Sequence, residues 1–116
     1  MIGAGYVGLV SGACFADFGH HVVCIDNDVQ RVESLRAGLI PIFEPGLDDL
    51  VGTNMRSNRL SFSGQLPDAV ADADLVFIAV GTPSRRGDGH ADLSFVYQAA
   101  EAIAAALRGF TVIVTK

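Results

Sequence analysis

Short apolar runs alternate with longer segments along the whole chain, and their order predicts the fold class. The apolar runs, rich in β-branched residues, are expected to be strands at residues 21–25, 60–62, 75–80 and 110–115. The longer segments are expected to be helices at residues 6–18, 29–37, 47–55 and 92–107, with a helical turn at 68–72. Strands that alternate with helices favour an α/β domain with a parallel sheet. The run 75–80 is apolar throughout, as expected of a parallel strand covered on both faces.

Capping residues support these helix boundaries. Asp28 and Asp92 stand where a helix N-cap is expected, and both can accept a hydrogen bond from a free backbone N–H. Gly19, Gly38 and Gly109 stand where the helices should end, because glycine readily adopts the positive φ that is common there.

The sequence Gly-Ala-Gly-Tyr-Val-Gly at residues 3–8 has the Gly-x-Gly-x-x-Gly spacing of dinucleotide-binding turns. Gly3 permits a tight turn after the first strand, Gly5 lets a pyrophosphate approach the backbone, and Gly8 lets the helix pack close to the sheet. The helix N-terminus adds free N–H groups and a partial positive charge. The candidate cofactor contacts in this turn are Gly3, Ala4, Gly5, Tyr6, Val7 and Gly8. Any glycine-rich turn before a helix is the alternative, which the apolar helix and following strand weaken.

An acidic residue ends the second expected strand and predicts the cofactor. Asp26 lies 18 residues after Gly8, close to the spacing of about 20 at which a carboxylate accepts hydrogen bonds from the adenosine ribose. Its charge, with Asp28 nearby, disfavours a 2′-phosphate, so we expect NAD rather than NADP. Arg31, on the first turn of the next helix, is a candidate for the ribose or a phosphate; a solvated surface arginine is equally compatible with its spacing.

A second candidate contact follows the apolar run 75–80. Ligands of open α/β sheets bind outside the carboxyl ends of the strands. There, Gly81 would let a ligand come close and Thr82 would offer a hydroxyl group. A plain turn at the end of a strand is the alternative.

Composition limits the classes of function. The 116 residues suffice for one domain, half of them are hydrophobic, and the net charge is −5. The acidic balance argues against general binding of nucleic acid or of anionic membranes. No apolar stretch is long enough to span a membrane, and the first basic residue is Arg31, so we expect neither a membrane helix nor a signal peptide but a cytoplasmic protein. Cys14 and Cys24 lack metal-site spacing and are expected to be buried thiols.

The expected fold is a Rossmann-type, doubly wound parallel sheet in a single domain over residues 1–116, with strand order 3-2-1-4-5-6. Only Met1 and Ile2 precede the first glycine, so we expect the sheet to be truncated at its central first strand and again after the last strand. A shortened central strand leaves backbone groups unpaired, which predicts marginal stability.

Three motifs, in this order and at these distances, make the chain resemble a known family. They are residues 3–9 (Gly-Ala-Gly-Tyr-Val-Gly-Leu), residues 42–47 (Ile-Phe-Glu-Pro-Gly-Leu) and residues 80–83 (Val-Gly-Thr-Pro). The chain resembles the N-terminal NAD-binding domain of the UDP-glucose/GDP-mannose dehydrogenase family, over essentially its whole length. Residues 11–20 and 81–94 look most like the bacterial members that oxidise UDP-glucose.

The resemblance implies oxidation of UDP-glucose to UDP-glucuronate with two NAD⁺, by an enzyme that is usually a dimer or larger and feeds polysaccharide synthesis. It places the pyrophosphate on the turn 3–8, the ribose on Asp26, and a family basic residue at Arg31; Thr82 lies in a cofactor-contacting motif. Glu44 is a family marker without an assigned role. The family's nucleophilic cysteine belongs to a later domain, so we expect no catalytic residue and no turnover from this chain alone.

Two alternatives stay open. A sister enzyme that uses GDP-mannose or a UDP-N-acetylhexosamine would share the cofactor residues, because sugar and base are recognised mostly outside this segment. A non-catalytic module that binds NAD or a partner without oxidising anything would also fit the glycine turn.

Overall fold

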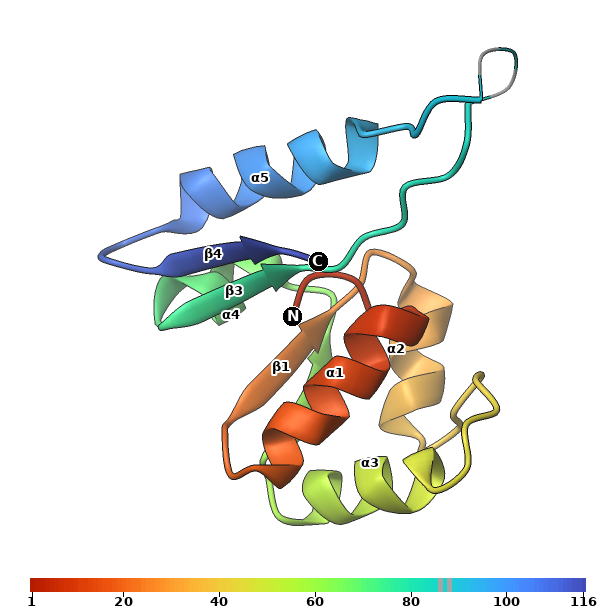
Figure 1. The fold of residues 1–116 in the computed structure, drawn as a ribbon. Helices are drawn as coiled ribbons and strands as arrows, with labels where there is room; N and C mark the ends of the chain where they lie inside the picture. The colour runs from red at the N-terminus through yellow and green to blue at the C-terminus, as the bar shows by residue number, and fades with distance from the viewer. Residues whose placement is uncertain (86, 88) are drawn as a thin grey trace.

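Parallel strands form the centre of the computed structural model, which describes residues 1–85, 87 and 89–116 (Figure 1). The strands in these residues are β1 (Val22–Ile25), β2 (Leu60–Ser63), β3 (Leu75–Ile78) and β4 (Val112–Thr115). β1 pairs in parallel with β2, and β3 pairs in parallel with β4. The α/β class and the parallel pairing predicted from the sequence are confirmed.

A short segment at the start of the chain joins the two strand pairs into one sheet. Ile2 forms parallel bridges to Ile25 of β1 and Ile78 of β3. Its N–H donates to the carbonyl oxygen of Phe77 at 2.8 Å, and its carbonyl accepts from Ala79 at 2.8 Å. On the other side, the Gly3 N–H donates to Ile25 at 2.7 Å. The spatial order is therefore β2, β1, residues 1–3, β3, β4, which agrees with the predicted order 3-2-1-4-5.

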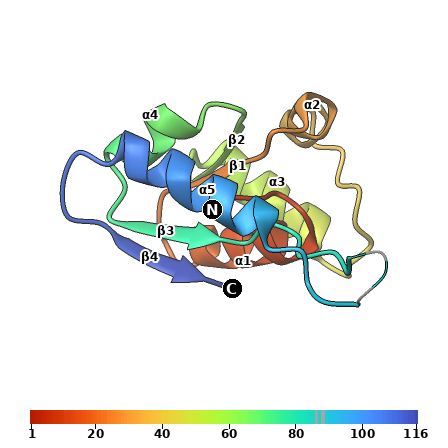
Figure 2. The same cartoon turned by 90° about the horizontal axis from the view of Figure 1, so that it is seen from above.

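Helices cover both faces of this sheet (Figures 1 and 2). They are α1 (Tyr6–Asp17), α2 (Val29–Arg36), α3 (Leu47–Arg56), α4 (Leu66–Ala71) and α5 (Ser94–Ala106). Cys24 of β1 belongs to the buried cluster of α1, α2 and α3, whereas the next residue, Ile25, belongs to the cluster of α4 and α5. Because successive side chains of a strand point to opposite faces, the two clusters lie on opposite sides of the sheet. The doubly wound arrangement is confirmed.

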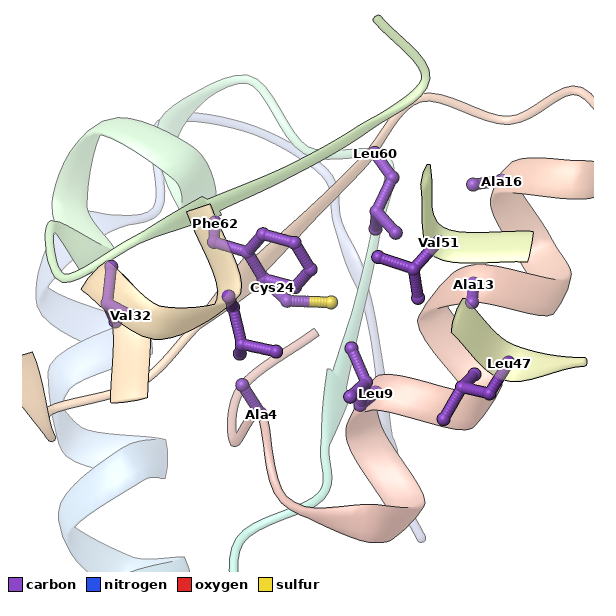
Figure 3. Packing of buried hydrophobic residues seen from close by; sticks show 11 residues of the cluster. Ala4, Leu9, Ala13, Ala16, Cys24, Val32, Leu47, Val51, Leu60 and Phe62 are labelled. Atoms are coloured by element: carbon purple, nitrogen blue, oxygen red, sulfur yellow. The ribbon is translucent and has the colours of Figure 1, made fainter. Parts of the chain in front are cut away.

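The larger cluster fixes α1 against the sheet. Leu9 and Ala13 of α1 are fully buried against Cys24, Val51 and Phe62, and Figure 3 shows the Cys24 sulfur pointing into this cluster. Burial raises the pKa of the Cys24 thiol to about 11, so this thiol behaves as a small apolar side chain.

The prediction that residues 75–80 form a strand covered on both faces is wrong in part. β3 has four residues, and only Val76 and Ile78 are buried, on the α4 and α5 side. On the opposite face Phe77 stacks on Phe15 of α1 with ring centroids 5.1 Å apart, while Leu75 stays 45% exposed.

Most helix caps lie where they were predicted. The Asp28 carboxylate accepts from the Arg31 N–H at 3.1 Å, and Gly19 and Gly38 have φ of +101° and +78°. At α5 the N-cap is Leu93, one residue later than predicted. The Asp92 carboxylate nevertheless accepts from the Ser94 N–H of the first turn at 3.0 Å, as a capping carboxylate does.

The other end of α5 stops earlier than expected. The C-cap is Leu107, whose extended backbone (ψ 134°) ends the helix before Gly109. Leu107 packs against the cluster of α4 and α5, and this packing fixes the end of the helix. The connection between β3 and α5 contains an antiparallel bridge between Ser84 and Ala91; Arg86 and Asp88 lie outside the described residues.

The predictions for the two cysteines can also be compared with the structure. Cys24 is buried as predicted, but Cys14 is only half-buried. In the part of the chain that the structure describes, no three His, Cys, Asp or Glu side chains gather as a metal site would require. Within the same part, every helix is too short or too polar to cross a membrane.

Candidate functional site

A cleft of about 600 Å³ opens at the carboxyl ends of the strands, where open α/β sheets bind ligands. Its walls come from the residues after each strand and from the start of α5. Of the ten predicted contacts it brings together Gly3, Gly5, Asp26, Arg31 and Gly81. Sequence reasoning missed further lining residues, namely Asn27, Gly64, Leu66, Phe95 and Gln98. Gln98 and Phe95 belong to a helix whose pattern gave no sign that it would face the cleft.

The other predicted contacts lie around this cleft rather than in its lining. Ala4 is buried beneath it, and Gly8 is buried where α1 meets the turn. Tyr6 and Val7 begin α1 and are 54% and 42% exposed. Thr82 is exposed in the connection that follows β3. The structure therefore gathers five of the ten predicted contact residues in the lining of the cleft and places the other five next to it.

The three glycines of the turn have three different surroundings. Gly3 has a φ of +97°, and a β-carbon there would lie 2.6 Å from the carbonyl oxygen of Ala79. A β-carbon on Gly8 would overlap the carbonyl oxygen of Gly3. At Gly5, by contrast, a β-carbon would meet no atom within 4 Å. Two glycines are thus required by the protein's own packing, while the third leaves open space at the cleft.

The start of α1 supplies donors to this open space. Gly5 is the N-cap and makes no side-chain capping hydrogen bond, and its carbonyl accepts the first helical bond from Leu9 at 2.8 Å. The N–H groups of the first helical turn have no partner within a helix, and the helix dipole adds partial positive charge. This arrangement suits an anion such as a pyrophosphate.

Asp26 is already surrounded by donors. Its Oδ2 accepts from the Ala4 N–H at 2.9 Å and from Arg31 Nη1 at 3.0 Å, and its Oδ1 accepts from the Asp28 N–H at 3.0 Å. An ionised carboxylate offers about four acceptor positions. One position is thus open, so a ribose that donates two hydroxyl groups to Asp26 must displace the Arg31 guanidinium. The Arg31 side chain is paired with Asp26, while 40% of it remains exposed to solvent.

Those donors also determine the charge of Asp26. Burial raises the pKa of its carboxyl group, but the hydrogen bonds from Asp28, Ala4 and Arg31, with the charge of Arg31, outweigh this effect and hold the pKa below its ordinary value of 3.8. The carboxylate is therefore ionised at neutral pH. A carboxylate at this position repels a 2′-phosphate by its negative charge, and it accepts a hydrogen bond from a 2′-hydroxyl.

The lowered pKa makes a prediction about stability and pH. A group whose pKa is lower in the folded state stabilises the fold above its unfolded pKa, and this contribution is lost as pH falls through the folded pKa. The difference in free energy of unfolding between wild type and Asp26→Asn should stay constant from about pH 8 to 5 and shrink below the ordinary value of 3.8. Urea titrations across this pH range measure it. A difference that already shrinks near neutral pH would contradict the assignment.

Sequence reasoning also missed a contact of the turn with a distant segment. Tyr6 Oη donates to Glu44 Oε2 at 2.8 Å. This hydrogen bond, together with the carboxylate charge, raises the pKa of Tyr6, so its hydroxyl stays a donor. The partners are 38 positions apart, and only the family marker around Glu44 hinted that this residue matters.

Comparison with known proteins gives matches over the whole chain. A model described as the UDP-glucose/GDP-mannose dehydrogenase family, NAD binding domain, matches residues 1–116. A UDP-glucose 6-dehydrogenase of Rhizobium meliloti is 70% identical over all of this chain, and UDP-glucose 6-dehydrogenase TuaD of Bacillus subtilis is 51% identical over the same length. The chain covers 26% and 25% of these two proteins, about a quarter of each.

Solved structures agree with these matches. A GDP-mannose dehydrogenase from Pseudomonas aeruginosa, in a ternary complex, matches with a TM-score of 0.93 at 34% identity, over 98% of this chain and 27% of that one. A UDP-glucose dehydrogenase from the archaeon Pyrobaculum islandicum matches with a TM-score of 0.91 at 45% identity, over 99% and 27%. The predicted Rossmann-type fold is therefore confirmed.

Proposed function

The chain belongs to the UDP-glucose/GDP-mannose dehydrogenase family as its NAD-binding domain, and we propose that it serves an enzyme that oxidises UDP-glucose to UDP-glucuronate. The observation that supports UDP-glucose as the substrate is the 70% identity, over the whole chain, to a relative named UDP-glucose 6-dehydrogenase. Oxidation of GDP-mannose is the second candidate, because an enzyme of that name shares the fold at 34% identity.

NAD, as hydride acceptor, supplies the redox chemistry, and residues of the turn fit its pyrophosphate. The open side of Gly5 gives the phosphates access to the backbone. The N–H groups at the start of α1 would donate to the phosphate oxygens. Gly3 and Gly8 keep the turn in the shape that this contact needs.

The remaining candidate residues bind the two ends of the cofactor. Asp26 would accept from the adenosine ribose once Arg31 moves off its Oδ2, and Arg31 would then face the ribose or a phosphate. Gly81 lines the cleft at the other end, and Thr82 follows it, where they would contact the nicotinamide half. Binding and orientation of NAD are thus the part of the reaction that these residues perform.

We assign no catalytic role within residues 1–116. Cys24 is buried with a raised pKa, and Cys14 is half-buried within α1; neither is proposed as a nucleophile. We further propose that the complete protein is a cytoplasmic homo-oligomer. Light scattering on the complete protein tests its oligomeric state.

The substrate is tested with a panel of nucleotide sugars on the complete protein. UDP-glucose, GDP-mannose and UDP-N-acetylmannosamine are each supplied with NAD⁺, and NADH formation is followed by absorbance. We expect UDP-glucose to be oxidised with two NADH formed per sugar. Turnover of GDP-mannose alone would contradict the proposal and favour the second candidate.

A further inference from the structure

The nucleotide-binding turn lacks the usual side-chain support for the start of a helix. Ser, Thr, Asp or Asn at an N-cap normally accept from a free N–H of the first turn. Here the N-cap is Gly5, which has no side chain to do so. A phosphate site needs this arrangement, because those N–H groups must stay available for the ligand. The support for the first turn of α1 must therefore come from elsewhere.

The Tyr6 side chain supplies one such support. Tyr6 is the first residue of α1, and the residue is 54% exposed, so packing alone does not fix its side chain. Its hydroxyl donates to Glu44 Oε2 at 2.8 Å. The side chain of the first helical residue is thereby attached to a different part of the molecule, the connection between α2 and α3.

Glu44 is itself held by an anchored turn. Its carbonyl accepts from the Leu47 N–H at 3.0 Å, and Leu47 is buried in the cluster of α1, α2 and α3. Gly46, with a φ of +83°, provides the left-handed step into α3. Ile42 packs against the same cluster, whereas Phe43 is 97% exposed. The backbone at Glu44 therefore has a fixed position from which the carboxylate reaches Tyr6.

We propose that Glu44 is a positioning residue for NAD, acting through Tyr6 to hold the first turn of α1 in the orientation that presents its N–H groups to the pyrophosphate. The inference rests on the NAD-binding role of this turn and assigns a part to Glu44, whose role the sequence left open. The hydrogen bond from the Tyr6 hydroxyl stabilises the Glu44 carboxylate.

The test compares ligands with and without a pyrophosphate. Tyr6→Phe and Glu44→Ala should each weaken the binding of ADP-ribose and of NADH roughly three- to tenfold. This is less than the loss of a direct hydrogen bond to a charged group, because the lost bond acts on the ligand only through the position of the turn. The double variant should be no weaker than either single variant. Glu44→Gln should restore most of the affinity, because its amide oxygen still accepts from Tyr6. Adenosine, measured by displacement of NADH, should bind all variants equally.

Tyr97→Phe and Glu101→Ala are the matched controls, because these side chains lie on α5 and outside the cleft lining. They should bind ADP-ribose like wild type. Wild-type affinity for ADP-ribose in Tyr6→Phe, or an equal loss for adenosine, would overturn the proposal. Failure of the wild-type chain to bind NADH would instead overturn the NAD-binding role, and the inference with it.

Discussion

Replacing Asp26 by alanine is expected to lower the affinity for NADH roughly 100-fold. Two hydrogen bonds from ribose hydroxyls to an ionised carboxylate would be lost, each contributing on the order of 1.5 kcal/mol or more. The affinity for NADPH should rise or change little, because the variant removes the charge that would repel its 2′-phosphate. It also frees Arg31, which lies 3.0 Å from the Asp26 carboxylate in the wild-type protein.

Fluorescence titration with both nucleotides measures this change in preference. Asp48→Ala is the control, since Asp48 stands in the first turn of α3 and outside the cleft lining. It should keep the wild-type preference for NADH. An equal loss of affinity for both nucleotides in Asp26→Ala would mean that Asp26 supports the fold of the site rather than binding the ribose.

Alanine at Gly8 and alanine at Gly5 are both expected to weaken nucleotide binding, but only the change at Gly8 should lower stability. At Gly8 the new β-carbon overlaps the Gly3 carbonyl oxygen, a backbone atom, so the turn must shift. We expect a loss of about 3 kcal/mol in the free energy of unfolding, and with it the loss of nucleotide binding. At Gly5 the β-carbon meets no protein atom, so stability should be unchanged while NADH binding falls at least tenfold.

Urea unfolding and NADH titration of the same two variants separate these effects. Gly109→Ala is the control, because a β-carbon there also meets open space but lies outside the cleft lining. It should change neither quantity. Wild-type NADH affinity in Gly5→Ala would mean that the pyrophosphate does not approach the backbone at this glycine.

The sequence was sufficient to predict features that depend on a residue and its near neighbours in the chain. The spacing of Gly3, Gly5 and Gly8 predicted a turn with two sterically required glycines and one open side. Asp28 was predicted as an N-cap, and its carboxylate accepts from the N–H three residues on. These features depend on backbone geometry within a few residues, which the sequence determines directly.

Tertiary contacts determined what the sequence could not predict. The sequence could not predict the contact between Glu44 and Tyr6, because the turn anchored by Leu47 brings the two side chains together only in the folded structure. The pairing of Asp26 with Arg31 was missed because spacing does not distinguish a solvated arginine from a paired one. The exposure of Leu75 was missed because an apolar run does not report how far a helix reaches across it.

The most direct test of the proposed NAD site is a titration of the purified chain with NADH and with NADPH, followed by nucleotide fluorescence. We expect saturable binding of NADH that is clearly tighter than that of NADPH, because the ionised Asp26 is the residue proposed to accept from the ribose hydroxyls. A folded chain that binds neither nucleotide, or that prefers NADPH, would contradict this proposal.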